Sequence, residues 1–263
     1  MKETTKPLLS FVCVTYNRQN KIKRAIKSFL DNNSDLSELV LIDDGSNDNT
    51  FDFIKGFLKS NKIIYHKLEK NMGVGFARNY GVKISNADWI VLLDSDNELK
   101  PNSIKLFINV INNFSYIDMH KFNVVNFENK MMCENLDHSK TINFKEYLTE
   151  TVKGEHQTLV KKKYLLKNKF FEEFNGGERL TWSLIAKECK KVMYHPFVSQ
   201  LYDDSGKDRL SIRSKNISRL LEIFAKDIKL FWFNYLTSNP AFFLIKLLKF
   251  TYYFILDKLK KKI

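Results

Sequence analysis

The sequence predicts an α/β fold in which a mostly parallel sheet is flanked by helices, followed by a C-terminal extension of basic, amphipathic helices. Three observations support this. Short apolar runs rich in β-formers alternate with segments that have helical apolar spacing. Several of these runs end in polar or acidic residues, as strands of ligand-binding α/β sheets do. From Ser211 onward, apolar and basic residues recur together at helical spacing.

The elements of the first half follow one another as strand, helix, strand. Apolar runs predict strands at Leu8–Thr15, Leu39–Ile42, Ile63–His66 and Trp89–Leu93. Helical spacing predicts the intervening helices at Gln19–Leu30, Thr50–Leu58 and from Asn71 to about Ser85. Because crossover connections of this kind join parallel strands, the alternation predicts a parallel sheet with helices on its faces.

Polar side chains follow three of these strands: Tyr16 with Asn17, Asp43 with Asp44, and Asp94 with Asp96. Open α/β sheets bind ligands at the carboxyl ends of their strands. Asp94 and Asp96 would repel each other there, and Mg²⁺ or Mn²⁺ would relieve that repulsion. The alternative is that Asp96 or Asn97 caps a helix that has Pro101 in its first turn.

The segment Asn71–Asn79 contains a Gly-x-Gly before a helix, as dinucleotide-binding loops do. Its third position is Arg78 instead of glycine or alanine, and it follows the third strand rather than the first. We therefore favour a different interpretation, in which the helix N-terminus and Arg78 face an anion.

The second half is less regular. We predict a helix at Pro101–Asn113, a strand at Met119–Phe127, a helix at Leu180–Glu188 and a strand pair at Val192–Tyr202 that is interrupted at Pro196. Glu178 lies at the start of the second of these helices, after two glycines. A carboxylate there is favoured by the helix dipole. It is also a candidate general base on a flexible loop.

Composition narrows the possible partners and the compartment. The net charge of +13 suits a partner that carries phosphate. The three cysteines are far apart and predict neither a zinc site nor a disulfide framework. Met1–Pro7 lacks the apolar run of a signal peptide, so a reducing cytoplasm is expected.

The tail segment Ala241–Leu256 is very apolar but contains Lys246 and Lys249. It falls short of the roughly 20 apolar residues that a membrane-spanning helix needs. Amphipathic helices that lie in the membrane interface fit this composition better, with an anionic membrane surface as partner. The alternative is a helix packed on the main domain, with Lys258–Lys262 as a solvated end.

Four segments together carry a family resemblance: Ser10–Asn17, Leu41–Thr50, Asn71–Gly81 and Asp88–Asp96. In order and spacing they resemble the nucleotide-sugar domain of family 2 glycosyltransferases, inverting enzymes with the GT-A fold, here of the bacterial surface-polysaccharide type. The resemblance implies a nucleotide-sugar half at residues 1–100, an acceptor half of the same domain at 101–210 and C-terminal amphipathic helices at 211–263.

The resemblance also implies roles at the matching positions. Tyr16 would flank the nucleobase, with Asn17 beside it and with backbone groups of Val14 and Thr15. Asp44 would bond the base, and Asp43 would support the loop or ribose. Arg78 would lie near the base or phosphates. Asp94 and Ser95 would bind the ribose side of the donor, and Asp96, with Asp94, the metal, Mn²⁺ or Mg²⁺.

The catalytic base is the position where this sequence departs from the family. Many relatives have Glu-Asp where this chain has Glu178-Arg179, and the Asp is usually the base. The resemblance therefore implies that Glu178 is the base, with Asp203 and Asp204 as alternatives.

The implied activity is metal-dependent inverting transfer of a hexosyl or N-acetylhexosaminyl group from a nucleotide sugar, expected to be a UDP-sugar. The acceptor would be a hydroxyl of a glycan or lipid-linked glycan in surface-polysaccharide synthesis. We expect a cytoplasmic protein, peripheral on the inner face of the cell membrane.

Two other functions would account for part of the sequence. A sugar-phosphate nucleotidyltransferase usually has a basic, Gly-rich loop after the first strand, where this chain has Tyr16-Asn17-Arg18. A non-catalytic nucleic-acid-binding module would leave the acids at the strand ends unexplained, since they repel phosphate without a metal. No nucleic-acid partner is therefore expected.

Overall fold

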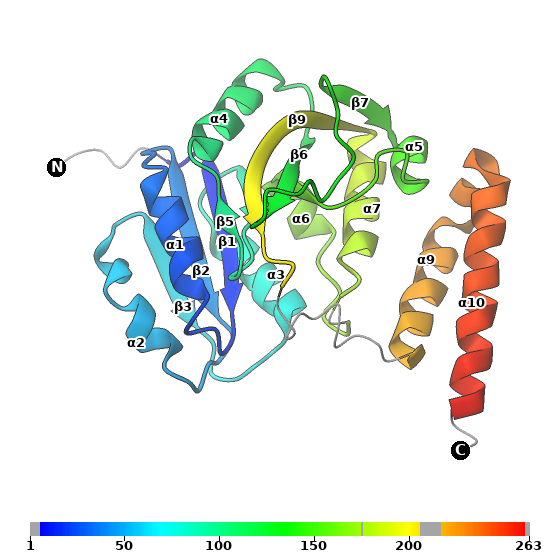
Figure 1. Ribbon diagram of the computed structural model, residues 1–263, viewed down its shortest axis with the longest axis horizontal. Helices are drawn as coiled ribbons and strands as arrows, with labels where there is room; N and C mark the ends of the chain where they lie inside the picture. Colours follow the sequence, from blue (N-terminus) through cyan, green and yellow to red (C-terminus); the bar gives the residue numbers. More distant parts are fainter. Residues whose placement is uncertain (1–5, 175, 206–216, 261–263) are drawn as a thin grey trace.

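The computed structural model describes residues 6–174, 176–205 and 217–260, and their side chains up to 258. The described residues form a single mixed sheet of nine strands in the order β3-β2-β1-β4-β8-β6-β9-β5, with β7 paired to β9. Helices cover both faces, and two further helices stand at one side of the domain (Figure 1).

The first half is the parallel part of the sheet. Its strands are β1 (Leu9–Thr15), β2 (Ser37–Asp43), β3 (Ile63–Lys67) and β4 (Trp89–Leu92), and all their mutual pairings are parallel. The connections are α1 (Ile22–Asp31), α2 (Thr50–Ile54) with a 3₁₀ turn at Phe57–Lys59, and α3 (Val74–Ile84). The predicted order of elements in this half is confirmed.

Alternation along β1 explains how both faces of the sheet are covered. Phe11 and Cys13 point into a core shared with α1 and α4, whereas Val12 points into a second core shared with α3. Gly81 of α3 lies directly over this strand, because an added Cβ would come within 2.5 Å of Val12. The helix therefore packs closely on the strands whose ends form the site.

The second half extends the same sheet. Its elements are β5 (Glu98–Leu99), α4 (Ser103–Asn113), β6 (Met119–Asn126), β7 (Lys140–Asn143), α5 (Phe144–Leu148), β8 (His156–Lys161), α6 (Lys162–Lys167), α7 (Glu178–Cys189) and β9 (Lys191–Tyr202). Strand β8 is antiparallel to both β4 and β6, so β6 runs in the direction of β4. The carboxyl ends of β1, β2, β4 and β6 therefore meet at one edge.

Two predictions about this half are wrong. Strand β9 is continuous, because Pro196 and Phe197 bulge out of the pairing between His195 and Val198 while the strand continues past them. The helix-cap alternative for Asp96 or Asn97 also fails. Strand β5 follows them, and α4 begins only at Ser103 with no side-chain cap.

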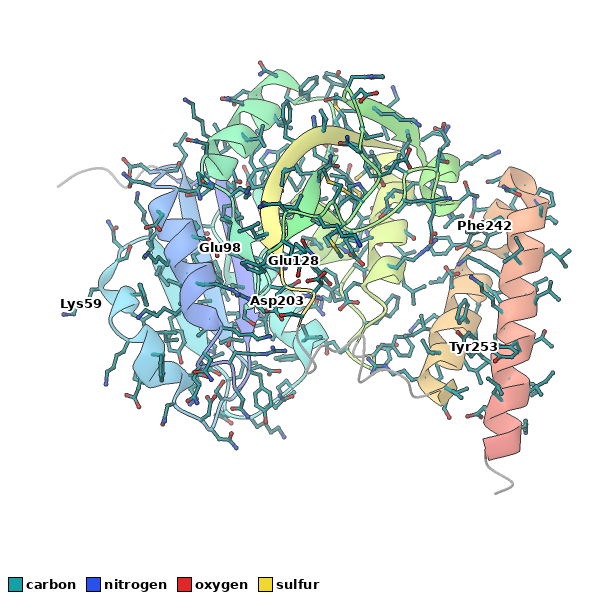
Figure 2. All side chains as sticks on the ribbon, viewed as in Figure 1. Lys59, Glu98, Glu128, Asp203, Phe242 and Tyr253 are labelled. Atoms are coloured by element: carbon teal, nitrogen blue, oxygen red, sulfur yellow. The ribbon has the colours of Figure 1, made fainter. Side chains whose placement is uncertain are left out.

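The C-terminal extension is a pair of helices, α9 (Ile217–Ser238) and α10 (Pro240–Lys260), with Asn239 between them. Phe231 and Tyr235 of α9 are buried against Leu148 of α5. Helix α10 lies on the outer side of α9 (Figure 1), and its Phe242 and Tyr253 face α9 (Figure 2). No described helix is long and apolar enough to cross a membrane.

One buried ion pair holds the two helices together. The Lys246 ammonium of α10 lies 2.5 Å from the Asp227 carboxylate of α9, and the Tyr235 hydroxyl donates to the same carboxylate at 3.0 Å. Lys246 was expected among the cations of an amphipathic surface. It points inward instead. Among the side chains that the structure describes in these two helices, the exposed cations are Lys229, Lys249 and Lys258.

Candidate active site

The end of β2 supplies two buried carboxylates that bind the loops around them. Asp43 accepts from the Ser46 amide at 2.7 Å and from the Tyr65 hydroxyl at 3.2 Å. Asp44 accepts from the amides of Met72 and Gly73 at 2.7 and 3.0 Å. Burial raises the pKa of the Asp44 carboxyl. Asp44 therefore ties the end of β2 to the loop that precedes α3.

The end of β1 is built from backbone turns and an exposed ring. Asn17 has a left-handed φ of 51° and accepts a bond from the Asn47 amide at 3.0 Å through its side chain. The Thr15 carbonyl accepts from the Asp44 amide at 2.8 Å, and Val14 is half-buried. The Tyr16 side chain is 40% exposed beside these turns. Its ring is thus available to a planar ligand.

Arg78 joins two acids that are far apart in the sequence. Its guanidinium lies 2.8 Å from an Asp94 carboxylate oxygen and 2.9 Å from one of Glu178. Burial acts to lower the pKa of Arg78, but the two carboxylates outweigh it and raise that pKa. The Phe170 ring lies beneath the guanidinium at 5.5 Å. Asp94 and Glu178, both candidate site residues, therefore flank one cation.

Asp96 lies beside this cluster. Its carboxylate is 3.6 Å from the Arg18 guanidinium, and its backbone carbonyl accepts a hydrogen bond from Arg24. Burial and the neighbouring Asp94 charge raise the pKa of the Asp96 carboxyl. Ser95, between the two acids, is buried. The surroundings of Asp96 therefore disfavour its charged form.

A hard divalent cation beside Asp94 and Asp96 would offset the repulsion between their carboxylates. Carboxylate oxygens suit Mg²⁺ and Mn²⁺, which are commonly bound by one or two carboxylates plus phosphate oxygens of a substrate. Within the described residues no group of three His, Cys, Asp or Glu side chains is placed to hold a metal alone. Asp94 and Asp96 therefore fit a metal that is shared with a phosphate ligand.

The loop before α7 presents Glu178. Gly176 and Gly177 have φ values of 103° and 87°, which only glycine adopts without strain, and Glu178 is the first residue of the helix. Arg179 turns away from the site, pairs with Glu150 and donates to the Leu148 carbonyl at 3.1 Å. The basic residue after Glu178 therefore serves the packing of α5 and leaves Glu178 facing Arg78.

Both alternative acids, Asp203 and Asp204, interact with other side chains. Asp203 lies 2.7 Å from the Arg24 guanidinium and 3.2 Å from the Lys21 ammonium. Although burial opposes it, hydrogen bonds from Ser205, Arg24 and Lys21 hold the pKa of Asp203 well below its usual range. Asp204 accepts from the Asn126 amide group at 2.9 Å. A carboxylate with so low a pKa is a weak proton acceptor, so Asp203 is poorly suited to act as a general base.

Sequence reasoning missed the cations at the start of α1. Arg18 and Lys21 lie in the turn between β1 and α1, and Arg24 lies in the first turn of α1, so the three cations follow the end of β1 at intervals of three residues. They meet Asp96 and Asp203 there. This basic spacing beside a strand end was the signal that could have revealed them.

The start of α9 also reaches the site. A Cβ added to Gly176 would lie 3.5 Å from the Arg219 guanidinium, and one added to Gly177 would lie 3.7 Å from Ile223. The loop that presents Glu178 is therefore covered by the C-terminal extension.

Comparison with known proteins accounts for this arrangement. Residues 10–167 match the family described as "Glycosyl transferase family 2". The chain belongs to glycosyl transferase family 2. It is therefore a glycosyltransferase, and the expected family resemblance is confirmed.

One curated relative matches most of this family 2 chain. It is the GalNAc(5)-diNAcBac-PP-undecaprenol beta-1,3-glucosyltransferase of Campylobacter jejuni. The two are 26% identical over 221 residues, which are 81% of this chain and 71% of the relative.

Solved structures share the fold. TarS 1-349 of S. aureus in complex with UDP-GlcNAc superposes with a TM-score of 0.74 at 16% identity, covering 92% of this chain and 71% of that one. The mannosyltransferase PcManGT of Pyrobaculum calidifontis, in complex with GDP-Man and Mn²⁺, superposes with a TM-score of 0.64 at 15% identity, covering 86% and 66%. The GT-A fold expected from the sequence is confirmed.

Proposed function

We propose that this family 2 glycosyltransferase transfers a hexosyl or N-acetylhexosaminyl group from a UDP-sugar to a hydroxyl of a glycan or lipid-linked glycan, with inversion and with a divalent metal. The observation that carries the proposal is the cluster of Asp94, Asp96, Arg78 and Glu178 at the carboxyl edge of the sheet. The C. jejuni relative, named for an undecaprenol-linked acceptor, supports a lipid-linked glycan in surface-polysaccharide synthesis.

The donor would lie along the ends of β1 and β2. The exposed Tyr16 ring would stack on the uracil, with Asn17 and the backbone of Val14 and Thr15 beside it. Asp44 would bond the base while it keeps its bonds to the loop before α3, and the buried Asp43 would support the loop at Ser46. With the base placed there, the diphosphate would lie beside Asp94, Ser95 and Arg78.

The chemistry at the diphosphate needs charge neutralisation. Mn²⁺ or Mg²⁺ bound by Asp96 and Asp94 would offset the charge on the departing UDP. Arg78 would add a fixed positive charge beside the phosphates. Glu178 would take the proton of the acceptor hydroxyl, and Arg78 orients its carboxylate at 2.9 Å.

The C-terminal helices would hold the enzyme on the inner face of the cell membrane. Trp232, Leu248 and Tyr252 are 51%, 62% and 60% exposed on the outer side of the pair. Lys229, Lys249 and Lys258 are exposed on the same two helices. Apolar and aromatic side chains together with cations favour an anionic lipid surface.

The test is UDP release from UDP-glucose, UDP-GlcNAc and UDP-GalNAc, with Mn²⁺, with Mg²⁺ and with chelator. Release should require the metal. Asp96→Ala should lower it at least about a hundredfold, because the charge on the leaving group loses its counterion. Asp88→Ala, an exposed acid before the same strand, is the control. Near-normal turnover of Asp96→Ala would refute the metal role.

A further inference from the structure

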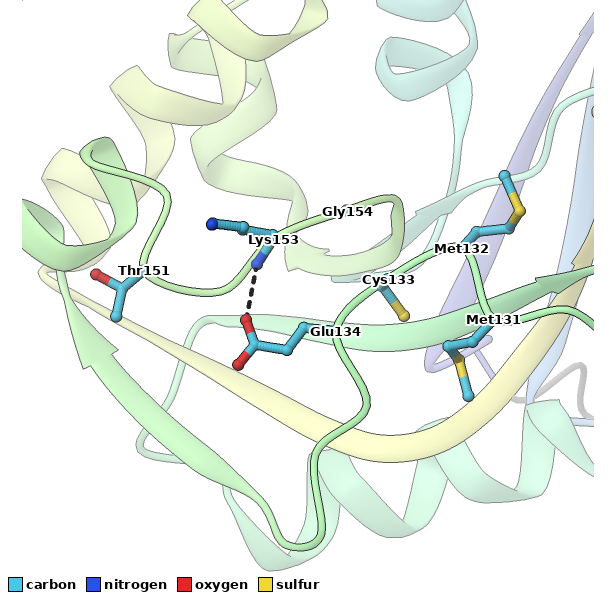
Figure 3. A pocket seen from close by; sticks show the side chains of 7 residues that line it. All are labelled: Met131, Met132, Cys133, Glu134, Thr151, Lys153 and Gly154. Atoms are coloured by element: carbon cyan, nitrogen blue, oxygen red, sulfur yellow. Dashed lines mark hydrogen bonds between the residues drawn. The ribbon is translucent and has the colours of Figure 1, made fainter. Parts of the chain in front are cut away.

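One cavity of the described structure lies away from the donor residues. It has a volume of about 650 Å³, within the range of small-molecule sites. One wall is the segment from Met131 to Glu134 and the other is Thr151 with Lys153 and Gly154, as Figure 3 shows. Nothing in the arrangement of the donor site uses these residues.

Both walls come from the edge of the sheet that carries Asp94 and Asp96. Met131 pairs with Val125 at the end of β6, and β6 runs in the direction of β4. The second wall precedes β8, which is antiparallel to β4 and therefore starts at the edge where β4 ends. The strand order β2-β1-β4-β8-β6 places β4 between the donor strands and this pocket.

A direct chain of contacts joins the pocket to the acids. Phe127, in the turn that leads to Met131, lies 4.3 Å from the Arg24 guanidinium. Arg24 in turn donates to the Asp96 carbonyl. The turn that leads to the first wall thus contacts Arg24, which is bonded to Asp96, four residues after the end of β4.

The two walls are locked together. Cys133 bridges to Gly154, where an added Cβ would come within 2.3 Å of the Cys133 Cα. The Lys153 amide donates to one Glu134 carboxylate oxygen at 3.3 Å (Figure 3). The two walls of the pocket are therefore held together by contacts within the chain.

The lining has the chemistry of a saccharide site. Met131, Met132 and Cys133 are half-buried and give a polarisable, apolar floor. Glu134, Thr151 and Lys153 are exposed at the rim. Within the described residues, the second Glu134 oxygen and the Thr151 and Lys153 side chains make no hydrogen bond. They offer one charged acceptor and two donors above an apolar surface.

We propose that this pocket binds the saccharide part of the acceptor, with the C–H face of a sugar ring on the methionines and its hydroxyls on Glu134, Thr151 and Lys153. The inference rests on the proposed function, because an acceptor must lie across Asp94 and Asp96 from the nucleotide. It assigns acceptor recognition to residues outside the donor site.

Methionine methyl groups allow the donor site and the pocket to be observed separately in the full-length protein. Met72 lies beside Asp44 at the donor edge, Met131 and Met132 line the pocket, and Met119 is buried in the core. With ¹³C-methyl methionine, UDP with Mg²⁺ should shift the Met72 signal. The methyl glycosides of glucose, GlcNAc and GalNAc are the acceptor probes. At least one of them should shift Met131 and Met132 and leave Met119 unchanged.

Variants make the assignment specific. Glu134→Gln should weaken binding of the glycoside about tenfold, since a charged hydrogen-bond acceptor is lost. UDP affinity should stay within about twofold. Glu128→Gln, an exposed acid on the turn before the pocket, is the matched control and should change neither affinity. Thr151→Trp should fill the pocket from its rim and abolish glycoside-stimulated UDP release, while release without acceptor persists.

The outcomes separate the two proposals. A Met72 shift with UDP but no shift of Met131 or Met132 with any of the three glycosides would overturn the pocket assignment and leave the donor site standing. Equal effects of Glu134→Gln and Glu128→Gln would overturn it as well. Absence of any Met72 response to UDP and Mg²⁺ would instead count against the proposed function.

Discussion

The ion pairs at the carboxyl edge of the sheet and the ion pair under the C-terminal helices are built from similar groups but differ in their surroundings. Arg78 meets two carboxylates whose side chains are 46% and 35% exposed. Lys246 meets one, Asp227, whose side chain is 6% exposed and also bonded by Tyr235. The first cluster is open to an incoming ligand, whereas the second is closed by its own partners.

The open cluster is suited to ligand binding, whereas the closed pair stabilises the fold. In the closed pair every charge has a partner that no solute can reach, so its effect is to hold α10 on α9. In the open cluster Asp94 and Glu178 share the Arg78 guanidinium, and burial and the Asp94 charge raise the pKa of Asp96. Partly exposed ion pairs of this kind are open to exchange of partners when a ligand arrives.

The largest effect should come from the open cluster. Glu178→Gln should lower turnover by about 10² to 10⁴, because the acceptor proton loses its base while the shape of the loop is kept. UDP affinity should change little, and both quantities follow from steady-state kinetics and titration calorimetry. Glu188→Gln, at the other end of α7, is the control. Retained turnover would move the base elsewhere, with Asp203 tested next.

The closed pair should show a large effect on stability. Asp227→Asn should leave the Lys246 ammonium buried without its counterion and cost about 3 to 5 kcal/mol of unfolding free energy, measured by chemical denaturation. The double variant Asp227→Leu with Lys246→Met should recover most of that loss, since an apolar pair replaces the charges. If the single and double variants are equally unstable, the pair is not what holds the helices.

The outer surface of the same helices should show a moderate effect on membrane binding. Trp232→Ser with Tyr252→Ser should reduce pelleting with anionic liposomes about tenfold, because two interfacial aromatic side chains are lost. Substitution is cleaner than removal from Asn239 onward, which would leave Asp227 without Lys246. Tyr116→Ser, an exposed ring on the main domain, is the control. Unchanged pelleting would contradict a membrane role for this surface.

The smallest effect concerns a third buried cation, one without a contacting carboxylate. Lys121 bonds the Thr158 hydroxyl at 2.7 Å and lies over the Trp182 ring at 5.2 Å. Burial lowers the pKa of Lys121 to about 8. Between that pH and about 10.4 the unfolded chain holds a proton that the native protein has released, so stability should rise with pH in this window.

Lys121→Met should flatten that rise. Denaturation of both proteins across the window should give a gain for the wild type that is larger by about 1 to 3 kcal/mol. A parallel dependence in the two proteins would mean that the Lys121 ammonium is solvated.

The first half of the fold was predictable because its signals are local. Phe11, Cys13 and Val12 alternate within one apolar run, and the acids follow within two residues of a strand end. The positions that failed depend on distant partners. Pro196 suggested a break in β9, but the bulge opposite Phe122 and Asn123 accommodates it. Strand β5 is two residues long and exists only through its pairing with β9.

Some residues of the candidate site could likewise be predicted from local motifs, whereas their contacts with distant residues could not. Asp94, Asp96 and Arg78 could be named from motifs at the strand ends. That Arg78 contacts Glu178 could not, because a hundred residues separate them and the contact depends on how α7 packs. From the sequence alone, Lys246 would likewise be predicted to be a surface cation of a helix. Its side chain points inward because it pairs with Asp227 on the neighbouring helix.

Helix α9 belongs to both regions compared above, the open cluster that includes Glu178 and the closed pair of Asp227 and Lys246. Its first turns cover the loop of Gly176 and Gly177, and its last turns carry the exposed Trp232 and Phe233. A helix of 22 residues is about 33 Å long and does not compress. It therefore sets a fixed distance between the Glu178 loop and the exposed Trp232 and Phe233 rings. Inserting one helical turn between them would move those rings about 5.4 Å further from the loop.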